Sequence, residues 1–178
     1  MYRKILVALD SSPARSVVLS EAIEIAKAMN ADLRLVHVLS AYDEASPGLP
    51  LRAYQSYYPV ADSIAWETYQ ERWEAYQQAG REELQKQAEA AQALGVQAEF
   101  TQIVGDPGRV ICEIACSWEA SLIVVGNRGR TGLSEFLLGS VSNYVMHHAP
   151  CSVLVVHSAS AKEKPSDQDD KTVVAVGH

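Results

Sequence analysis

The chain has 178 residues, enough for one domain with a substantial hydrophobic core. Hydrophobic residues make up 48% of it and charged residues 21%, which is ordinary for a globular protein and excludes a disordered, fibrous or collagen-like chain. Fifteen Lys and Arg residues against 22 Asp and Glu residues give a formal net charge of −7. Because nucleic-acid-binding proteins need a positive face, small molecules and proteins are the expected partners, and nucleic acid is not.

Three features of the sequence bear on location. No apolar run approaches the roughly 18 residues needed to cross a bilayer, so we expect no membrane span. The N-terminus enters a strand-like run at once, without the apolar stretch of a secretory signal. Cys112, Cys116 and Cys151 form no Cys-x-x-Cys pair, which favours reduced thiols over disulfides or a zinc site. The sequence therefore predicts a cytoplasmic protein without a metal site of its own.

Short apolar runs alternate with helical patterns along residues 1–157. We expect strands at 4–9, 32–39, 96–104, 121–125 and 151–156, and helices at 14–29, 63–94, 108–119 and 139–148. Residues 40–62, rich in Pro, Gly, Tyr and Ser, are expected to form a long loop. Most of the strands are continuously apolar, which is typical of parallel strands buried on both faces. The fold class is thus α/β: a doubly wound, Rossmann-like, five-stranded parallel sheet of order 3-2-1-4-5.

The composition changes after residue 157. Residues 158–171 are small or charged and include no large apolar side chain, so we expect a solvated linker there. Residues 172–178 hold a short β-prone stretch. The chain is therefore divided into one domain of residues 1–157, the linker and a C-terminal tail.

Four aromatic residues of the expected helix 63–94 share one face. They recur at spacings of three, four and three: Trp66, Tyr69, Trp73 and Tyr76. We interpret this stripe as a packing face. The pattern leaves open whether the stripe packs within the subunit or on a partner.

Ligands of open parallel sheets bind outside the carboxyl ends of the strands, where the strand order reverses. In the order 3-2-1-4-5 this place lies between the first and fourth strands. Their carboxyl ends supply the first candidate site residues: Leu9, Asp10, Ser11, Val125, Gly126 and Asn127.

A Gly-rich stretch that follows the fourth strand is suited to phosphate binding. Gly126 and Gly129 allow the backbone to approach a phosphate, because a side chain at either position would stand in the way. Gly139 and Ser140 begin a helix, where N–H groups and the positive end of the macrodipole attract anions. The hydroxyls of Ser140 and Ser142 can donate further hydrogen bonds. Two separated phosphate-binding turns suit a polyphosphate.

This pattern resembles the motif of the universal stress proteins, and specifically of their ATP-binding branch. The motif, Gly-x2-Gly-x9-Gly-Ser/Thr, is met without a gap by Gly126, Gly129, Gly139 and Ser140. The resemblance covers nearly all of residues 1–157 and implies a fold similar to the adenine-nucleotide α-hydrolases.

The resemblance also implies how ATP would lie. Asp10 would sit beside the adenosine, the backbone near Ala8 and Val38 would line the adenine pocket, and residues 126–142, with Val141 among them, would hold the phosphates. Mg²⁺ would accompany ATP mainly through phosphate oxygens and waters, since no all-protein set of ligands is visible in the sequence.

Three polar side chains of this stretch have less definite roles. Asn127 stands where the family most often has a small hydroxyl residue, and its amide can donate a hydrogen bond instead. Arg128 and Arg130 either neutralise phosphates or are solvated on the loop, and the sequence does not decide between these roles.

These features favour a regulatory role in a stress response, in which ATP occupancy changes conformation or assembly with at most slow ATP hydrolysis. No Walker loop, nucleophilic triad or carboxylate pair is recognisable, so no catalytic residue is assigned. The alternative is an enzyme that uses ATP, by adenylation or hydrolysis, on the same fold. An adenylating enzyme or an FMN carrier needs a Gly-rich turn after the first strand, and residues 9–13 contain no glycine.

The strand at 151–156 is expected at one edge of the sheet. Its last four residues carry no charge or proline, and such an edge pairs readily with another chain. The resemblance implies a homodimer in which two copies of this strand pair antiparallel about a two-fold axis. A tetramer formed through the aromatic helix, an unidentified protein partner and the signal served are left open.

Overall fold

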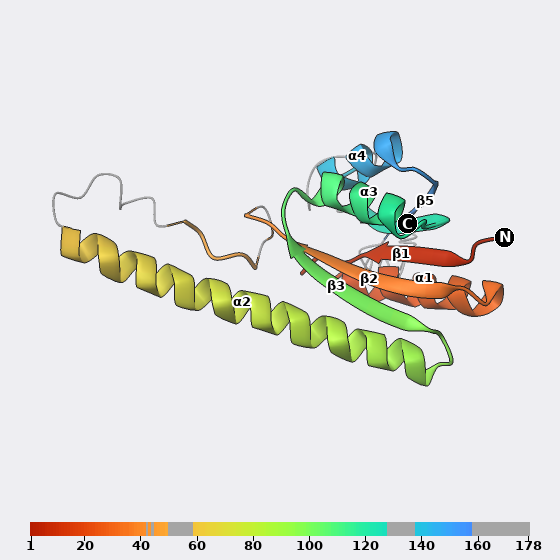
Figure 1. Ribbon diagram of the computed structural model, residues 1–178, viewed down its shortest axis with the longest axis horizontal. Coiled ribbons are helices and arrows are strands. Elements are labelled where there is room, and N and C mark those ends of the chain that lie inside the picture. The colour runs from red at the N-terminus through yellow and green to blue at the C-terminus, as the bar shows by residue number, and fades with distance from the viewer. Residues whose placement is uncertain (42, 44, 50–58, 128–137, 158–178) are drawn as a thin grey trace, which may run out of the picture.

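One sheet of five parallel strands organises the molecule (Figure 1). The computed structural model describes residues 1–41, 43, 45–49, 59–127 and 138–157, with only the backbone of 59–62. The sheet has the order β3-β2-β1-β4-β5, which confirms the predicted topology. Its strands are β1 (Lys4–Ala8), β2 (Asp32–Leu39), β3 (Ala98–Val104), β4 (Leu122–Asn127) and β5 (Ser152–His157). The described helices are α1 (Arg15–Met29), α2 (Pro59–Ala93), α3 (Pro107–Ser117) and α4 (Ser140–His148).

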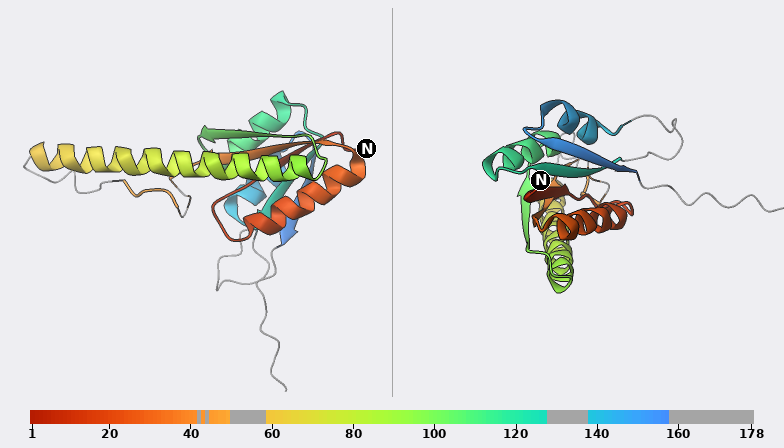
Figure 2. Two further views of the ribbon diagram at one scale, coloured as in Figure 1. Left: turned by 90° about the horizontal axis from the view of Figure 1, so that it is seen from below. Right: turned by 90° about the vertical axis from the view of Figure 1, so that its right-hand side faces the viewer.

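Helices cover both faces of the sheet, α1 and α2 on one side and α3 and α4 on the other (Figure 2). Alternation along β2 divides the core between these layers. Leu33 and Leu35 belong to the cluster beneath α1 and α2, whereas Val36 and Val38 belong to the cluster beneath α3 and α4. Burial on both faces explains why the strands read as continuous apolar runs.

Turn and cap residues end the elements where the sequence indicates. Asn30 closes α1 in the left-handed conformation, at φ 50°, which Asn tolerates better than most residues. Asp106 caps α3 by accepting a hydrogen bond from the Arg109 amide at 3.1 Å, and Pro107 occupies the first turn.

Two expected boundaries were wrong in ways that affect the site. The long loop ends earlier than residue 62, because α2 already begins at Pro59, a residue that the first helical position tolerates. Gly126 and Asn127, expected in the loop, are the last residues of β4. They remain in the strand because β5 continues beside them, with Gly126 opposite Val156 and Asn127 opposite His157.

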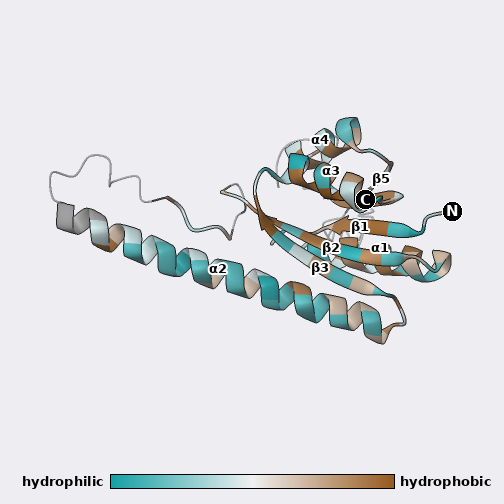
Figure 3. Ribbon diagram, in the orientation of Figure 1, coloured by the Kyte–Doolittle hydropathy of each residue, from teal (hydrophilic) through white to brown (hydrophobic). Residues whose placement is uncertain are grey.

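Helix α2 has 35 residues, a length of about 52 Å at 1.5 Å per residue, and only its C-terminal part packs on the sheet. Leu84, Ala88 and Ala91 are buried there, whereas no side chain between residues 63 and 79 is fully buried. This N-terminal part extends past the sheet and is mostly hydrophilic (Figures 1 and 3). Among the described helices, none is long and apolar enough to cross a membrane.

Gly80 marks the place where α2 comes close to the sheet. A Cβ atom at this position would lie 2.5 Å from Gln102 Nε2 and 3.1 Å from His37 Nδ1. The missing side chain therefore allows the helix to pack directly over β2 and β3, which explains a glycine inside a long helix.

Candidate functional site

The central strand β1 ends before both of its neighbours. Ala8 pairs with Val36 of β2 and with Val125 of β4, but β2 continues to Leu39 and β4 to Asn127. Beyond Leu9, whose amide still bonds to β2, no described residue continues the ladder between β2 and β4. The sheet is therefore interrupted there over two strand spacings, or roughly 9.6 Å. This interruption lies at the carboxyl ends of the strands, where the strand order reverses.

The backbone of Val38 faces this interruption. The Leu9 amide donates to the Val36 carbonyl at 2.8 Å, whereas the Gly105 amide donates to the Leu39 carbonyl at 3.1 Å on the opposite side. Because successive residues of a strand alternate in direction, Val38 presents its amide and carbonyl on the same side as Val36. One donor and one acceptor of β2 therefore point toward the space beyond the end of β1.

The chain leaves β1 through a tight turn that Asp10 closes. Its carboxylate Oδ1 accepts hydrogen bonds from the Ser12 amide at 3.0 Å and from the Ser12 hydroxyl at 2.5 Å. Helix α1 begins only at Arg15, with Ala14 at its N-cap, so Asp10 does not cap it. The half-buried carboxylate is instead held at the end of β1.

The start of α4 is joined to the end of β4. The Ser142 hydroxyl, which is buried, donates a 2.7 Å hydrogen bond to the Gly126 carbonyl. Its proton is therefore used within the protein, while the first amides of α4 have no acceptor inside the helix. A Cβ atom at Gly126 would lie 3.0 Å from Val18 of α1, so close packing against α1 also requires glycine there.

Asn127 presents an acceptor rather than a donor. Its amide nitrogen lies 3.1 Å from Nδ1 of His157 on β5. Its Oδ1 is buried, and no described residue donates to it. A buried carbonyl oxygen without a donor is costly, which makes this atom a candidate ligand contact.

The predicted site residues fall into two groups. Those at the carboxyl ends of three adjacent strands are brought together: Ala8, Leu9, Asp10, Ser11, Val38, Val125, Gly126 and Asn127. Those at the α4 start are tied to them through the bond between Ser142 and Gly126: Gly139, Ser140, Val141 and Ser142. Arg128, Gly129 and Arg130 lie outside the described residues.

No sequence pattern pointed to Asp43, a buried residue beside this site. Its Oδ2 accepts hydrogen bonds from the Ser11 hydroxyl at 3.0 Å and the Tyr76 hydroxyl at 2.9 Å, and lies 3.1 Å from His37 Nε2. The Ala45 amide donates to Oδ1. Burial by itself would raise the pKa of Asp43, but these hydrogen bonds, led by that of His37, outweigh it and hold the pKa well below its usual range. Asp43 is therefore a carboxylate at neutral pH.

A concave region lies at the opposite end of the sheet. Lys27, Asn30, Asp32 and Gly95 line part of a cavity of about 260 Å³ there. Because this region adjoins the amino ends of the strands, it is separate from the candidate site.

A sequence profile of the universal stress protein family matches residues 1–157. The chain belongs to the universal stress protein family. Among its relatives, universal stress protein Sll1388 of Synechocystis is 39% identical over 155 residues, which are 87% of this chain and 97% of that protein. Universal stress protein Slr1101 of Synechocystis is 47% identical over 100 residues, which are 56% of this chain and 93% of that protein.

A solved structure of a universal stress protein in complex with cAMP is also similar. It superposes with a TM-score of 0.56 at 27% sequence identity, over 88% of this chain and 97% of that one. The family assignment therefore rests on the sequence and on the fold.

Proposed function

We propose that this universal stress protein binds ATP between the ends of β1, β2 and β4, and that ATP occupancy regulates its conformation or assembly. The observation that carries the proposal is the interruption of the ladder beyond Leu9, with a carboxylate turn on one side and a helix start on the other. The solved relative in complex with cAMP supports an adenine nucleotide as the ligand. The spacing of Gly126, Gly129, Gly139 and Ser140 supports ATP in particular.

The adenine is proposed to bind along the side of β2 that no described strand covers beyond Leu9. The Watson–Crick edge of adenine offers one acceptor and one donor, which match the amide and carbonyl of Val38. Ala8 and Val38 are apolar and at least half-buried, so they suit the faces of a flat ring.

The distribution of charge gives ATP one orientation. The Asp10 carboxylate accepts hydrogen bonds and repels anions, so the ribose hydroxyls are proposed to lie beside it. The start of α4 attracts anions, so the phosphates are proposed to lie against Ser140 and Val141, with Arg128 and Gly129 completing their site. In the described part of the chain no three His, Cys, Asp or Glu side chains are grouped to hold a metal. Mg²⁺ would therefore be bound mainly by phosphate oxygens and waters.

The ligand is tested by mass spectrometry of the small molecules released when freshly purified protein is denatured, and by calorimetric titration with ATP and Mg²⁺. Gly129→Val is expected to weaken ATP binding at least about tenfold, or 1.4 kcal/mol, because its side chain would block the phosphates. Gly95→Ala, at the opposite end of the sheet and strained by a φ of 86°, controls for a general loss of stability. Unchanged affinity of Gly129→Val would remove the site as proposed.

The regulatory role predicts slow chemistry. No group is assigned to activate water, so we expect turnover of ATP well below the range of about 1 to 1,000 per second that is common for enzymes. Hydrolysis at ordinary enzymatic rates by contaminant-free protein would favour an ATPase instead.

Assembly is proposed to use β5. This strand lies at the edge of the sheet, and Val153, Leu154 and Val155 are half-buried in the single chain. Antiparallel pairing of two copies would cover this edge. Val155→Asp is expected to dissociate the dimer, because it places an unpaired charge in a dry interface. Sedimentation of the native protein as a monomer at micromolar concentration would contradict this arrangement.

A further inference from the structure

The Asp43 cluster, formed by Ser11, His37, Asp43 and Tyr76, joins three elements that are far apart in the sequence. Ser11 belongs to the turn after β1, His37 to β2 and Tyr76 to α2. All three reach one atom, Oδ2 of Asp43, at 2.9 to 3.1 Å. Asp43 is 8% exposed and His37 is 6% exposed, so water competes little for these bonds.

One arm of the cluster reaches the proposed nucleotide site. Ser11 directly follows Asp10, whose own carboxylate holds Ser12. Two carboxylates therefore hold the turn. Asp10, within the turn, accepts from Ser12, and Asp43, outside it, accepts from Ser11. A backbone movement of this turn that carries Ser11 away from Asp43 would also move the Asp10 carboxylate, because that carboxylate is hydrogen-bonded to Ser12 of the same turn.

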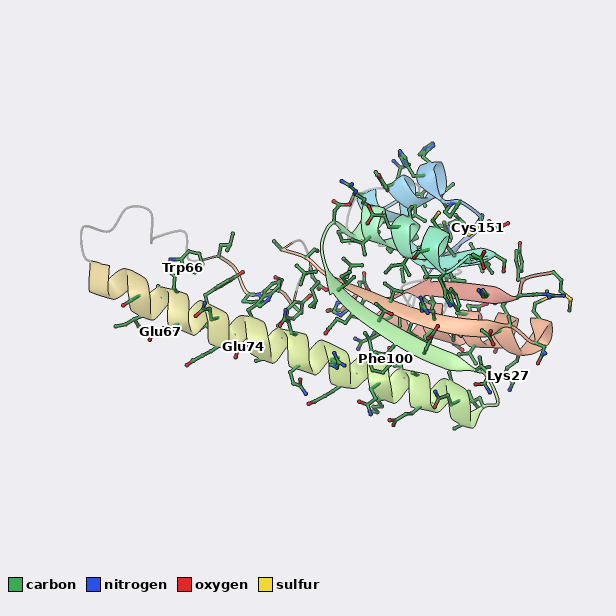
Figure 4. The ribbon with its side chains drawn as sticks, viewed as in Figure 1. Lys27, Trp66, Glu67, Glu74, Phe100 and Cys151 are labelled. Carbon is green, nitrogen blue, oxygen red and sulfur yellow. The ribbon has the colours of Figure 1, made fainter. Side chains whose placement is uncertain are left out.

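The other arm reaches the aromatic stripe of α2. The stripe is a chain of ring contacts, and the ring centroids of Trp73 and Tyr76 lie 5.5 Å apart. Tyr69 stacks on Trp73 at 6.2 Å and meets Trp66 edge to face at 5.8 Å, which confirms that the four rings share one face. Trp66, 45% exposed, points away from the side of α2 that carries Glu67 and Glu74 (Figure 4). Among the described ring contacts and hydrogen bonds, those of Tyr76 with His37 and Asp43 join the stripe to the globular part.

We propose that Asp43 is a positioning residue of the nucleotide site and couples that site to the aromatic half of α2. The inference rests on the proposed nucleotide binding. Ser11 and Tyr76 hydrogen-bond to the same carboxylate oxygen, so a change in one bond alters the geometry available to the other. Nucleotide binding at the turn therefore changes the packing of the stripe, and by reciprocity a partner that moves the stripe changes nucleotide affinity.

Tryptophan fluorescence measures this coupling directly. The chain has three tryptophans, and Trp118 lies at the other end of the sheet, where its carbonyl accepts a hydrogen bond from Lys4. In a Trp118→Phe background, emission comes from Trp66 and Trp73, both within the stripe. ATP with Mg²⁺ is the ligand, and calorimetry on the same samples measures binding independently.

Tyr76→Phe is the decisive variant. It removes the hydroxyl that donates to Asp43 and keeps the ring, and Asp43 retains its other donors. We expect ATP affinity to change by less than about tenfold, because Tyr76 lies outside the nucleotide site, while most of the fluorescence change on ATP binding is lost. Tyr69→Phe is the matched control, since no described hydrogen bond joins its hydroxyl to Asp43, and it should keep the full response.

The outcomes separate the two proposals. Binding by calorimetry, with a fluorescence change that Tyr76→Phe loses and Tyr69→Phe keeps, supports the coupling. Binding without any fluorescence change, or with an equal change in both variants, overturns the coupling and leaves the nucleotide site standing. If the Trp118→Phe protein and the native protein both fail to bind ATP, the proposed function is overturned, and the coupling falls with it.

Discussion

The burial of polar side chains differs between the two ends of the sheet. At the amino ends, Arg34 pairs with Glu99 and Lys4 with Glu119, and the two glutamates are 54% and 85% exposed. At the carboxyl ends, Asp43 is buried with its donors, and Asn127 holds a buried oxygen that no described residue satisfies. Buried polar groups cost free energy unless they are bonded, whereas exposed ion pairs cost and contribute little. Desolvated polar groups therefore gather at the end where the ligand is proposed.

At the amino end, partly buried basic side chains are paired with exposed glutamates and make further contacts. The Arg34 guanidinium lies 4.6 Å from the centroid of the Trp118 ring, and Lys4 donates to the Trp118 carbonyl. Ser121 accepts hydrogen bonds from the amides of Arg3 and Lys4. None of these contacts is fully buried, so we expect the loss of one to be tolerated.

The largest effect is expected from Asp43→Ala. It leaves the donors of Ser11, His37 and Tyr76 without their acceptor, and we expect the free energy of unfolding at pH 7 to fall by about 3 kcal/mol or more. Urea denaturation measures this change. A loss below about 1 kcal/mol would mean that the Asp43 contacts stabilise the protein no more than the exposed ion pairs at the amino end do.

The pH dependence of stability tests the contribution of the buried Asp43 carboxylate separately. The folded pKa of Asp43 lies below its unfolded value of about 3.9, so its stabilisation is complete above that value and is lost as the pH falls toward the folded pKa. The stability difference between the native protein and Asp43→Asn should therefore shrink as the pH falls below about 4. A difference that grew on acidification would show the opposite shift.

Gly126→Ala tests the packing between β4 and α1. Its Cβ atom would approach Val18 Cγ2 to 3.0 Å, and we expect a loss of about 1–2 kcal/mol from overpacking. Val18→Ala removes the clashing methyl groups, so Gly126→Ala should cost less in a Val18→Ala background. Equal costs in both backgrounds, measured by thermal unfolding, would rule out this contact as the cause.

The smallest effect is expected at the amino end. Glu99→Gln removes the negative charge that pairs with Arg34 but keeps an oxygen that can accept its hydrogen bonds. Arg34 also keeps its contact with Trp118, so stability should fall by less than about 1 kcal/mol. High salt should reduce the difference further, because exposed pairs are screened. A larger cost that persists in high salt would show that this pair behaves like a buried one.

Most elements followed from periodicity, because buried parallel strands and capped helices leave local patterns in the sequence. The strand order followed from the rules that govern connections in doubly wound sheets. The end of β4 could not be predicted in this way, because Gly126 and Asn127 belong to the strand through their pairing with β5. The start of α2 was missed because Pro59 reads as a loop residue when it follows two tyrosines.

The candidate site also has residues that local sequence features predict and residues that only the fold brings together. Strand ends are local features, and the residues that they indicated lie together at the carboxyl ends of three adjacent strands. That these residues bind a nucleotide stays a prediction. Asp43 depends on partners 32, 6 and 33 residues away, and such contacts leave no spacing to detect. Ser142 was expected to offer its proton to a ligand, but the neighbouring Gly126 carbonyl takes it.

The length of α2 has a consequence for how this helix forms. An isolated helix of fewer than about 12–15 residues is marginal in water, because its first turn is costly to nucleate. The part of α2 that packs on the sheet, around Leu84 and Ala88, supplies that nucleus. The helix then propagates from it toward Pro59 and must pass Gly80, a residue of low helix propensity. Amide hydrogen exchange should therefore quicken steadily toward Pro59. We therefore expect the part of α2 between Pro59 and Trp73, beyond the bond of Tyr76 to Asp43, to open more readily than the sheet.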